Sequence, residues 1–309
     1  MSVILAENLT KHYGIVHAVN NLSLTVQENS VIGLIGPNGA GKTTTIKMVL
    51  GLLKPDEGHV EIFGENPWDN PDLRNNIGVV HEKNYFPAHQ KVLNYLERVC
   101  RIFGVPEFRA REVLGLVNLE EANDRQIKAL SAGMLQKFGI AHALIHKPKL
   151  VVADEMTANL DPLARSSLLD LVLKLHKEEK VTFLLSSHIL PELSRVCDSV
   201  AVMNRGKVWA SGKLDELYDK FSARTVRIFT DQPEKLAEQV KALPYVEHVS
   251  IDSRGISVKV AEGKEDNLYE DTPKLARKSG AKIQGIESES TSLEELYRQI
   301  VTQQGEKQK

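Results

Sequence analysis

Nine residues near the N-terminus, Gly-Pro-Asn-Gly-Ala-Gly-Lys-Thr-Thr at positions 36–44, constrain the fold more than any other feature of this chain. They match the pattern G-x-x-x-x-G-K-[ST]. The apolar run 31–35 before them is typical of a buried strand, and residues 44–50 after them can form a helix. A strand, a glycine-rich turn and a helix in this order direct backbone N–H groups and the positive end of the helix dipole at one anion. The alternative, a plain glycine-rich turn, does not explain the flanking strand and helix.

Each part of this loop has an expected task at a nucleotide phosphate. The glycines permit backbone conformations and close approaches that a Cβ atom would block. Lys42 would reach the β- and γ-phosphates, and the Thr43 hydroxyl would hold Mg²⁺. The candidate nucleotide-binding residues of the loop are Gly36, Pro37, Asn38, Gly39, Ala40, Gly41, Lys42, Thr43 and Thr44.

Composition limits the class of protein. The chain has 309 residues, 42% hydrophobic and 26% charged, with a net charge of −2, so it resembles a soluble globular protein with no bulk attraction for nucleic acid or anionic lipid. No apolar run approaches the roughly 20 residues that span a bilayer, and we expect no signal peptide. Cys100 and Cys197 lie in apolar surroundings and are expected to be buried thiols in a reducing cytosol. No cluster of metal-ligating residues is evident.

The order of apolar segments predicts an α/β domain followed by a smaller α+β domain. Expected strands of the first part cover 3–9, 22–26, 31–35, 59–63, 150–153, 181–185, 199–203 and 207–210. Residues 82–149 have helical spacing, Asp161-Pro162 starts one later helix and Pro191 opens another. Unbroken apolar strands between helices predict a covered, mostly parallel sheet.

The sequence changes character near residues 221–223. Beyond them the expected order is β-α-β-β-α-β, as in ferredoxin-like domains, with strands over 225–230, 247–252, 256–261 and 282–287 and helices over 233–243 and 266–279. A capping box at 292–295 begins a last helix. We therefore expect domains over 1–220, with a helical subdomain at about 83–149, and over 224–303, followed by a flexible tail over 304–309.

A second chemical feature is the apolar strand 150–153, which ends in Asp154 and Glu155. Asp154 at the strand tip can bind Mg²⁺ through water, and Glu155 can orient an attacking water molecule. A solvated acidic helix cap is the alternative interpretation. The phosphate loop upstream favours the metal and water-activating roles.

Leu130-Ser131-Ala132-Gly133-Met134 comes before an expected helix over about 135–145, and its N-terminus would offer another phosphate site. Alone this is an ordinary capped helix. It stands some twenty residues before the acidic strand, however, and in that position residues 1 to about 220 resemble the nucleotide-binding subunit of ABC transporters. The further matching motifs are Leu160-Asp161 for the D-loop, His188 in Ser186-Ser187-His188 for the switch histidine, and Tyr13 for the aromatic residue that stacks on adenine.

The resemblance implies roles for these positions. Two subunits would meet head to tail, with ATP between one phosphate loop and the other subunit's Ser131 and Gly133. Glu155 would polarise the lytic water, His188 would steady the γ-phosphate and Asp161 would couple the two sites. We expect Lys42, Glu155 and His188 to be catalytic, Thr43, Asp154 and Glu82 to hold Mg²⁺, and ATP to be the nucleotide.

The chain departs from the family pattern at several positions. Met156 follows the catalytic glutamate in place of proline, and Ala158-Asn159 replaces Ser-Gly. The signature loop has Ala132 for glycine and Met134 for glutamine. Glu82 stands where the family commonly has a glutamine that senses Mg²⁺ and the membrane partner, and a carboxylate can still bind the metal. Because the core catalytic positions are retained, we predict an active ATPase.

The small C-terminal domain and its Ser-Leu-Glu-Glu-Leu-Tyr helix resemble the drug- and polysaccharide-exporter branch, in which the permease is a separate polypeptide. An RNA-recognition domain has the same element order but needs aromatic residues on its central strands, and 247–252 and 256–261 have none. The C-terminal domain is therefore expected to regulate or to stabilise a dimer.

Three functions are compared. The first is the ATP-hydrolysing homodimer of a membrane exporter, peripheral on the cytosolic face of the cell membrane, with residues 83–130 docking to the permease. The second is a soluble ABC-type ATPase acting in translation or on DNA, which the single nucleotide-binding domain and the absence of a heptad run disfavour. The third is a regulatory module without hydrolysis, which Glu155 and His188 disfavour.

Overall fold

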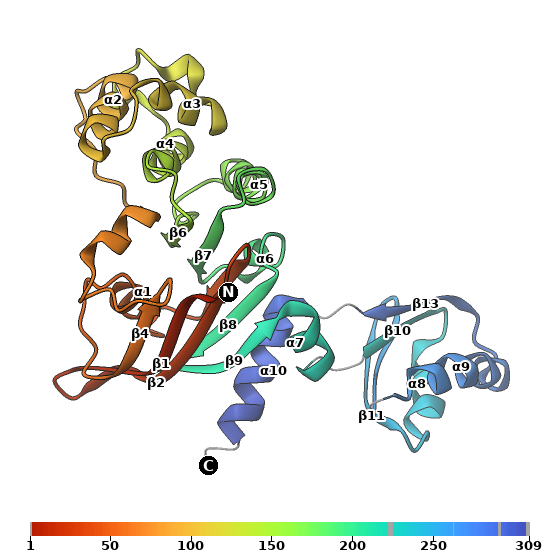
Figure 1. Cartoon of the computed structure of the whole chain (residues 1–309). Helices are drawn as coiled ribbons and strands as arrows, with labels where there is room; N and C mark the ends of the chain where they lie inside the picture. The colour runs from red at the N-terminus through yellow and green to blue at the C-terminus, as the bar shows by residue number, and fades with distance from the viewer. Residues whose placement is uncertain (1, 222–224, 262, 290–291, 307–309) are drawn as a thin grey trace. The chain divides into compact units, whose positions relative to one another are not determined.

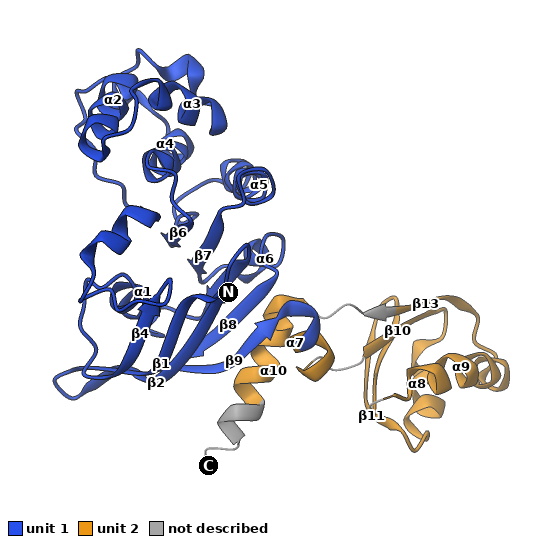
Figure 2. Cartoon of the chain, in the orientation of Figure 1, with its two compact units in different colours: residues 1–216 blue, residues 217–309 orange. Residues whose placement is uncertain are grey.

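The computed structural model describes all residues except 1, 222–224, 262, 290–291 and 307–309. The chain divides into two compact units, Met1–Glu216 and Leu217–Lys309 (Figure 2). Residues 222–224, near which the sequence changes character, lie outside the described part of the chain. The first unit contains the phosphate loop, and the second contains the ferredoxin-like element order.

A six-stranded sheet forms the centre of the first unit. Its strand order is β5 (Ile77–Val80), β6 (Leu150–Asp154), β7 (Thr182–Ser187), β3 (Val31–Ile35), β8 (Ser199–Asn204) and β9 (Lys207–Lys213). All pairs are parallel except β8 with β9. Every residue of β3 and β7 is buried, which requires both faces of the sheet to be covered. The predicted mostly parallel α/β sheet is confirmed.

A second, antiparallel sheet belongs to the same unit. It has the order β2 (Val16–Gln27), β1 (Ser2–Tyr13) and β4 (Glu57–Ile62). Along β1 the buried residues include Ile4, Ala6 and Leu9, which pack in one cluster with Ile46 and Met48 of α1 (Lys42–Val49). This cluster fixes the helix that follows the phosphate loop.

Helices of the first unit form a separate group between β5 and β6 (Figure 1). The group contains α2 (Val92–Phe103), α3 (Phe108–Leu116), η2 (Glu120–Ala122), η3 (Ile127–Ala129) and α4 (Ala132–Leu144), whereas η1 (Pro71–Asn76) comes directly before β5. In α2 the buried residues Leu93, Leu96 and Cys100 recur at helical spacing, and Gly104, with φ 65°, ends the helix. Later in the unit come α5 (Pro162–Glu179), α6 (Leu190–Leu193) and the start of α7 (Leu214–Phe221).

The second unit has a four-stranded antiparallel sheet with helices packed on it. Its elements are β10 (Thr225–Thr230), α8 (Pro233–Lys241), β11 (Val246–Asp252), β12 (Gly255–Val260), α9 (Glu265–Ser279), β13 (Ile283–Glu289) and α10 (Leu293–Glu306), with the strand order β11-β12-β10-β13. Val226, Ile228 and Val258 share a core with Leu236 and Leu268 from the helices. This confirms the predicted ferredoxin-like domain.

Several details differ from the sequence-based expectations. The strand β5 lies in the segment 77–80, to which no strand was assigned, and the helix expected at Pro191 is the single turn α6. In the four-stranded sheet of the second unit, the central strands are β12 and β10. Strand β10 does carry an aromatic residue, Phe229, whose ring lies under the guanidinium of Arg227. Helix α10 extends through Glu306, into the expected tail, whereas 307–309 lie outside the described residues.

Both cysteines are free and buried, as predicted. Among the helices within the described ranges, none has the length and apolar character needed to cross a membrane.

Candidate nucleotide site

The phosphate loop joins β3 to α1 and is shaped by glycine. Gly41 has φ 102°, and a Cβ atom there would lie 2.4 Å from the carbonyl oxygen of Ala18. At Gly36 a Cβ atom would lie 2.4 Å from the carbonyl oxygen of Met203. Helix α1 begins at Lys42 without a side-chain cap and without an acidic residue in its first turn. Its first N–H groups therefore remain suited to a phosphate group.

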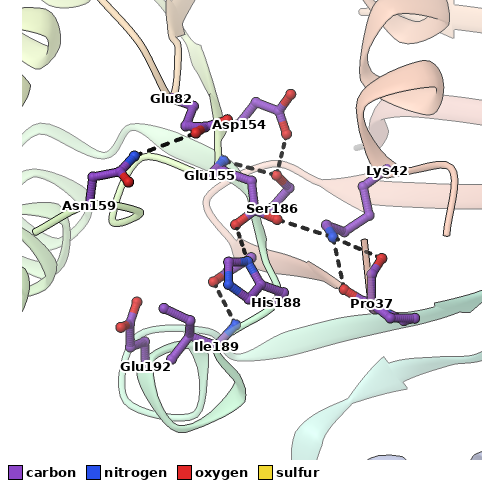
Figure 3. Close-up of polar contacts among 12 residues, drawn as sticks. Pro37, Lys42, Glu82, Asp154, Glu155, Asn159, Ser186, His188, Ile189 and Glu192 are labelled. Carbon is purple, nitrogen blue, oxygen red and sulfur yellow. Dashed lines mark hydrogen bonds and ion pairs between the residues drawn. The ribbon is translucent and has the colours of Figure 1, made fainter. Parts of the chain in front are cut away.

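Lys42 and Glu155 form an ion pair at this loop. The Nζ atom of Lys42 lies 3.1 Å from Oε1 of Glu155, and the two side chains are 6% and 13% exposed. The same ammonium group donates hydrogen bonds to the carbonyl oxygens of Gly36 (2.8 Å) and Pro37 (3.3 Å) (Figure 3). Three acceptors thus hold one positive charge where the loop would receive phosphate oxygens.

The carboxyl ends of neighbouring strands bring the acidic residues to the loop. Thr43 Oγ1 donates a 2.8 Å hydrogen bond to Asp154 Oδ2, and Ser186 Oγ donates a short one to Asp154 Oδ1. Asp154 pairs with Ser186 in the register of β6 and β7. A hydroxyl and a carboxylate at this spacing are oxygen donors of the kind that Mg²⁺ prefers, so Thr43 and Asp154 fit the expected metal.

Glu155 has a backbone conformation that non-glycine residues rarely adopt. Its φ is 49°, in the left-handed region. Its N–H group donates to Ser186 O (3.2 Å) and to Ser186 Oγ (3.1 Å), which holds the bend. Its Oε2 atom lies 2.7 Å from Nδ1 of His188. Strained backbone of this kind concentrates at functional sites because the surrounding structure must enforce it.

Glu82, the third predicted metal ligand, is held differently. It is exposed, and its Oε1 atom accepts a 3.5 Å hydrogen bond from Nδ2 of Asn159, which itself has φ 65°. Its carbonyl oxygen accepts from Nε2 of Gln136 at 2.8 Å. Among the residues that the structure describes, no three His, Cys, Asp or Glu side chains form a metal-binding group. Two of the departures from the family pattern, Glu82 and Asn159, thus contact each other.

Ser131 and Gly133 line a cavity of about 580 Å³ together with other residues. Those are Asn118, Leu119, Glu120, Glu121, Ala122, Arg125, Met134, Lys137, Ala164 and Ser167. Ser131 is exposed and caps α4, because its Oγ atom accepts a 3.3 Å hydrogen bond from the N–H of Met134. The helix therefore begins at Ala132, earlier than the expected Leu135. The residues around this cavity include none of the phosphate loop.

Asp161 and Tyr13 lie at the margins of the site. Asp161 is the N-cap of α5, and its Oδ1 atom accepts hydrogen bonds from the N–H groups of Leu163 and Ala164. Tyr13, 52% exposed, ends β1 and pairs with Val16 of β2. Strand β2 approaches the phosphate loop at the carbonyl oxygen of Ala18, next to Gly41.

Ser186 is a site residue that the sequence analysis does not predict. It appears there only as the first residue of the histidine motif Ser186-Ser187-His188. The signal was a serine at the end of the otherwise apolar segment 181–185, next to the acidic strand in a parallel sheet. Such a serine is buried and must find polar partners, and Asp154 and Glu155 supply them.

Together, a phosphate loop, an acidic strand, a histidine strand and a helical group inserted between β5 and β6 define an ATP-binding cassette. The model of the ABC transporter family matches residues 19–158. An uncharacterized ABC transporter ATP-binding protein of Bacillus subtilis (strain 168), YxlF, is 34% identical over 96% of this chain and 98% of its own length. The chain belongs to this family, the ATP-binding proteins of ABC transporters.

Two further similarities place the chain within the family. A protein named Nod factor export ATP-binding protein I, from Cupriavidus metallidurans (strain ATCC 43123 / DSM 2839 / NBRC 102507 / CH34), is 35% identical over 78% of this chain and 82% of its own. Among solved structures, cbiO1 from Clostridium perfringens, described as part of the transporter complex cbiONQ, matches with a TM-score of 0.65 and 27% identity. The match covers 70% of this chain and 90% of that one.

Proposed function

We propose that this chain hydrolyses ATP to drive an exporter whose permease is a separate polypeptide. The observation that carries the proposal is the meeting of Lys42, Asp154, Glu155 and His188 at the carboxyl ends of three adjacent strands, β6, β7 and β3. Phosphoryl transfer depends mainly on positioning and charge neutralisation, and this set of groups provides both.

The geometry suggests how the residues act. The N–H groups of α1 and the Lys42 ammonium bind the phosphates, and a γ-phosphate there competes with Glu155 for the same cation. Glu155 then orients the attacking water with its carboxylate, and His188 stays within hydrogen-bond reach of Glu155 Oε2. Thr43 and Asp154 would hold Mg²⁺, which neutralises charge on the β- and γ-phosphates when bound.

A homodimer completes the site in this proposal. The cavity that Ser131 and Gly133 line contains no residue of the phosphate loop, and in this proposal the turn reaches a phosphate by facing a second copy. The test is to measure, by light scattering, the molecular mass of full-length Glu155→Gln protein with ATP and Mg²⁺. A dimer that forms only with ATP supports the sandwich, and protein that stays monomeric while binding ATP contradicts it.

The helical group is the proposed docking surface for the permease, on the cytosolic face of the membrane. Tyr85, Ile102 and Phe108 expose 89%, 80% and 69% of their surface, so this part of the unit offers large apolar side chains that a protein partner can cover. Phe86 does not contribute to this surface, because its ring packs against Phe138 with centroids 4.9 Å apart. Replacing Tyr85 and Phe108 by serine should abolish co-purification with the permease from solubilised membranes while ATP hydrolysis persists.

The direction of transport, export, is supported by the name of a relative, Nod factor export ATP-binding protein I. The compound in that name is said of the relative and is not assigned to this chain. The alternative of a soluble ATPase in translation or on DNA is not favoured, because the relatives are named as transporter components. Phe229 alone gives an RNA-binding face little support, since Arg227 already covers its ring at 5.5 Å. The first experiment is to measure ATP hydrolysis by the purified full chain. We expect hydrolysis in the wild type and none in Glu155→Gln.

A further inference from the structure

A buried charge pair connects two loops of the site. Glu192, in the single turn α6, is buried, and its Oε1 atom lies 2.8 Å from Nε of Arg165 in α5. Nη2 of the same guanidinium donates a 3.1 Å hydrogen bond to the carbonyl oxygen of Leu160. One side chain therefore joins the loop that follows Glu155 to the turn that follows His188.

These contacts close a ring around the proposed base. From Glu155 the chain runs to Leu160, whose carbonyl is held by Arg165. Arg165 holds Glu192, four residues after His188, and His188 contacts Glu155 at 2.7 Å. Figure 3 shows Glu192 on the turn that carries His188 and Ile189. Because this chain of contacts begins and ends at the Glu155–His188 pair, a change at the Arg165–Glu192 pair is expected to alter how His188 is placed against Glu155.

Burial of the Glu192 carboxylate has an energetic cost, because the charge is removed from water. Burial raises the pKa of Glu192, while the hydroxyl of Thr157 and the charge of Arg165 oppose that rise. A buried ion pair is a weak source of stability compared with apolar packing of the same volume, so stability alone does not account for this pair. Helix α5 is also joined nearer the surface to the turn that follows α6, where Arg195 contacts Ser166 and Asp170 at 3.0 Å each.

We propose that Arg165 and Glu192 are positioning residues that hold His188 against Glu155, so that they set the turnover number and leave nucleotide affinity unchanged. This inference rests on the proposed hydrolysis at the same site. Neither residue belongs to the phosphate loop, and neither contacts Lys42 or Asp154 among the described contacts of those residues. The expected defect is therefore in kcat and not in binding.

The test compares full-length variants at saturating ATP and Mg²⁺. Glu192→Gln should lower kcat by about ten- to a hundredfold, the cost of misplacing a catalytic group, with an unchanged Kd for a fluorescent ATP analogue. Arg195→Gln is the matched control, because it breaks the other connection between α5 and the segment that follows His188, and it should keep the wild-type kcat. Equal losses in both variants would assign the effect to general loosening and overturn the proposal.

A second variant guards against misfolding. Arg165→Met with Glu192→Leu replaces the pair by apolar side chains, which should keep the unfolding temperature near that of the wild type. Turnover should stay as low as in Glu192→Gln, because the directional contact to Leu160 is gone. Wild-type turnover in this double variant would overturn the inference. If the wild type and Glu155→Gln are equally inactive, the proposed function itself fails, which is a different outcome.

Discussion

The ammonium nitrogen of Lys42 lies 3.1 Å from Oε1 of Glu155, so the cation of the phosphate loop and the proposed base are in direct contact. Both side chains are nearly buried, which strengthens their attraction relative to an exposed pair. In the proposed function, a γ-phosphate that engages Lys42 would release Glu155 from this contact. Nucleotide binding and preparation of the proposed base would then be one exchange of partners at Lys42.

This contact predicts the behaviour of Glu155→Gln. Turnover should fall by about 10²–10⁴-fold, because the amide cannot act as a base. ATP should bind at least as tightly as in the wild type, since a negative charge beside the phosphates is removed. Phosphate release and equilibrium binding measure the two effects. Glu178→Gln, on the exposed face of α5, is the control and should behave as the wild type; equal turnover in both variants would refute the assignment.

Gly41→Ala should disrupt the phosphate loop. The alanine would have to adopt φ near 102° and place its Cβ atom 2.4 Å from the carbonyl oxygen of Ala18. We expect a loss of about 1–3 kcal/mol in the free energy of unfolding, together with loss of ATP binding. Chemical denaturation and nucleotide titration provide the measurements.

Gly115→Ala is the contrasting variant. Gly115 lies in α3, and an added Cβ atom would find its nearest neighbour, Glu120 Oε1, at 3.5 Å. Helix propensity should raise stability there by up to about 1 kcal/mol without changing ATP binding. Equal destabilisation of the two variants would mean that the Gly41 conformation is not the cause.

How much of this site the sequence predicts depends on the range of each interaction. The phosphate loop and the Ser131 cap are local patterns, and the structure has both. The contact of Lys42 with Glu155 depends on strand order, because 113 positions separate them (155 − 42). No local pattern contains that order, so the sequence identified the members of the site and not their pairing.

The strand β5 illustrates the same limit within the fold. It has only four residues, and Gly78 weakens its local strand signal. That glycine is explained by packing: a Cβ atom there would lie 2.5 Å from the carbonyl oxygen of Ala143 in α4. Phe86 is similar: it lies within residues 83–130, the expected docking segment, but packs against Tyr95 and Phe138. Both outcomes depend on contacts distant in sequence.

Arg109 should be important for the stability of the helical group. It is buried, and its Nη2 and Nε atoms donate to the carbonyl oxygens of Leu144 (3.0 Å) and Ile145 (3.4 Å) at the end of α4. Arg109→Met should lower the free energy of unfolding by about 2–3 kcal/mol, because these carbonyls lose their charged donor. The exposed Arg111→Met is the control in denaturant titrations and should be nearly neutral.

His142 in α4 and His146, just after the end of that helix, should make the first unit sensitive to acid. Burial lowers the pKa of His142 and of His146 below the ordinary value of 6.5. The unfolded chain therefore binds protons first, so stability is full above pH 6.5 and declines as the pH falls below it. Figure 1 shows α4 beside α2 and α3, the group expected to loosen.

His142→Phe tests this directly. The ring of His142 lies 5.6 Å from that of Phe86 and 5.8 Å from that of Tyr95, an aromatic environment that accepts phenylalanine. Unfolding free energies between pH 7 and pH 5 should decline less steeply in the variant than in the wild type. His248 is an exposed residue of β11 in the second unit, so His248→Gln should leave the slope of unfolding free energy against pH unchanged. Identical slopes in all three proteins would exclude His142 as a cause.

Ser186 should be needed for turnover, because its hydroxyl contacts both acidic residues of the site at once. Its hydroxyl donates to Asp154 and accepts from the N–H of Glu155, whose left-handed backbone it helps to hold. Ser186→Ala should lower kcat by about tenfold or more through misplacement of Glu155, with a modest loss of stability of about 1–2 kcal/mol. Ser194→Ala removes an exposed hydroxyl that contacts only its own turn, through Pro191 O, and should be neutral. If Ser186→Ala kept full turnover while stability fell, the serine would support the sheet edge and not the position of the base.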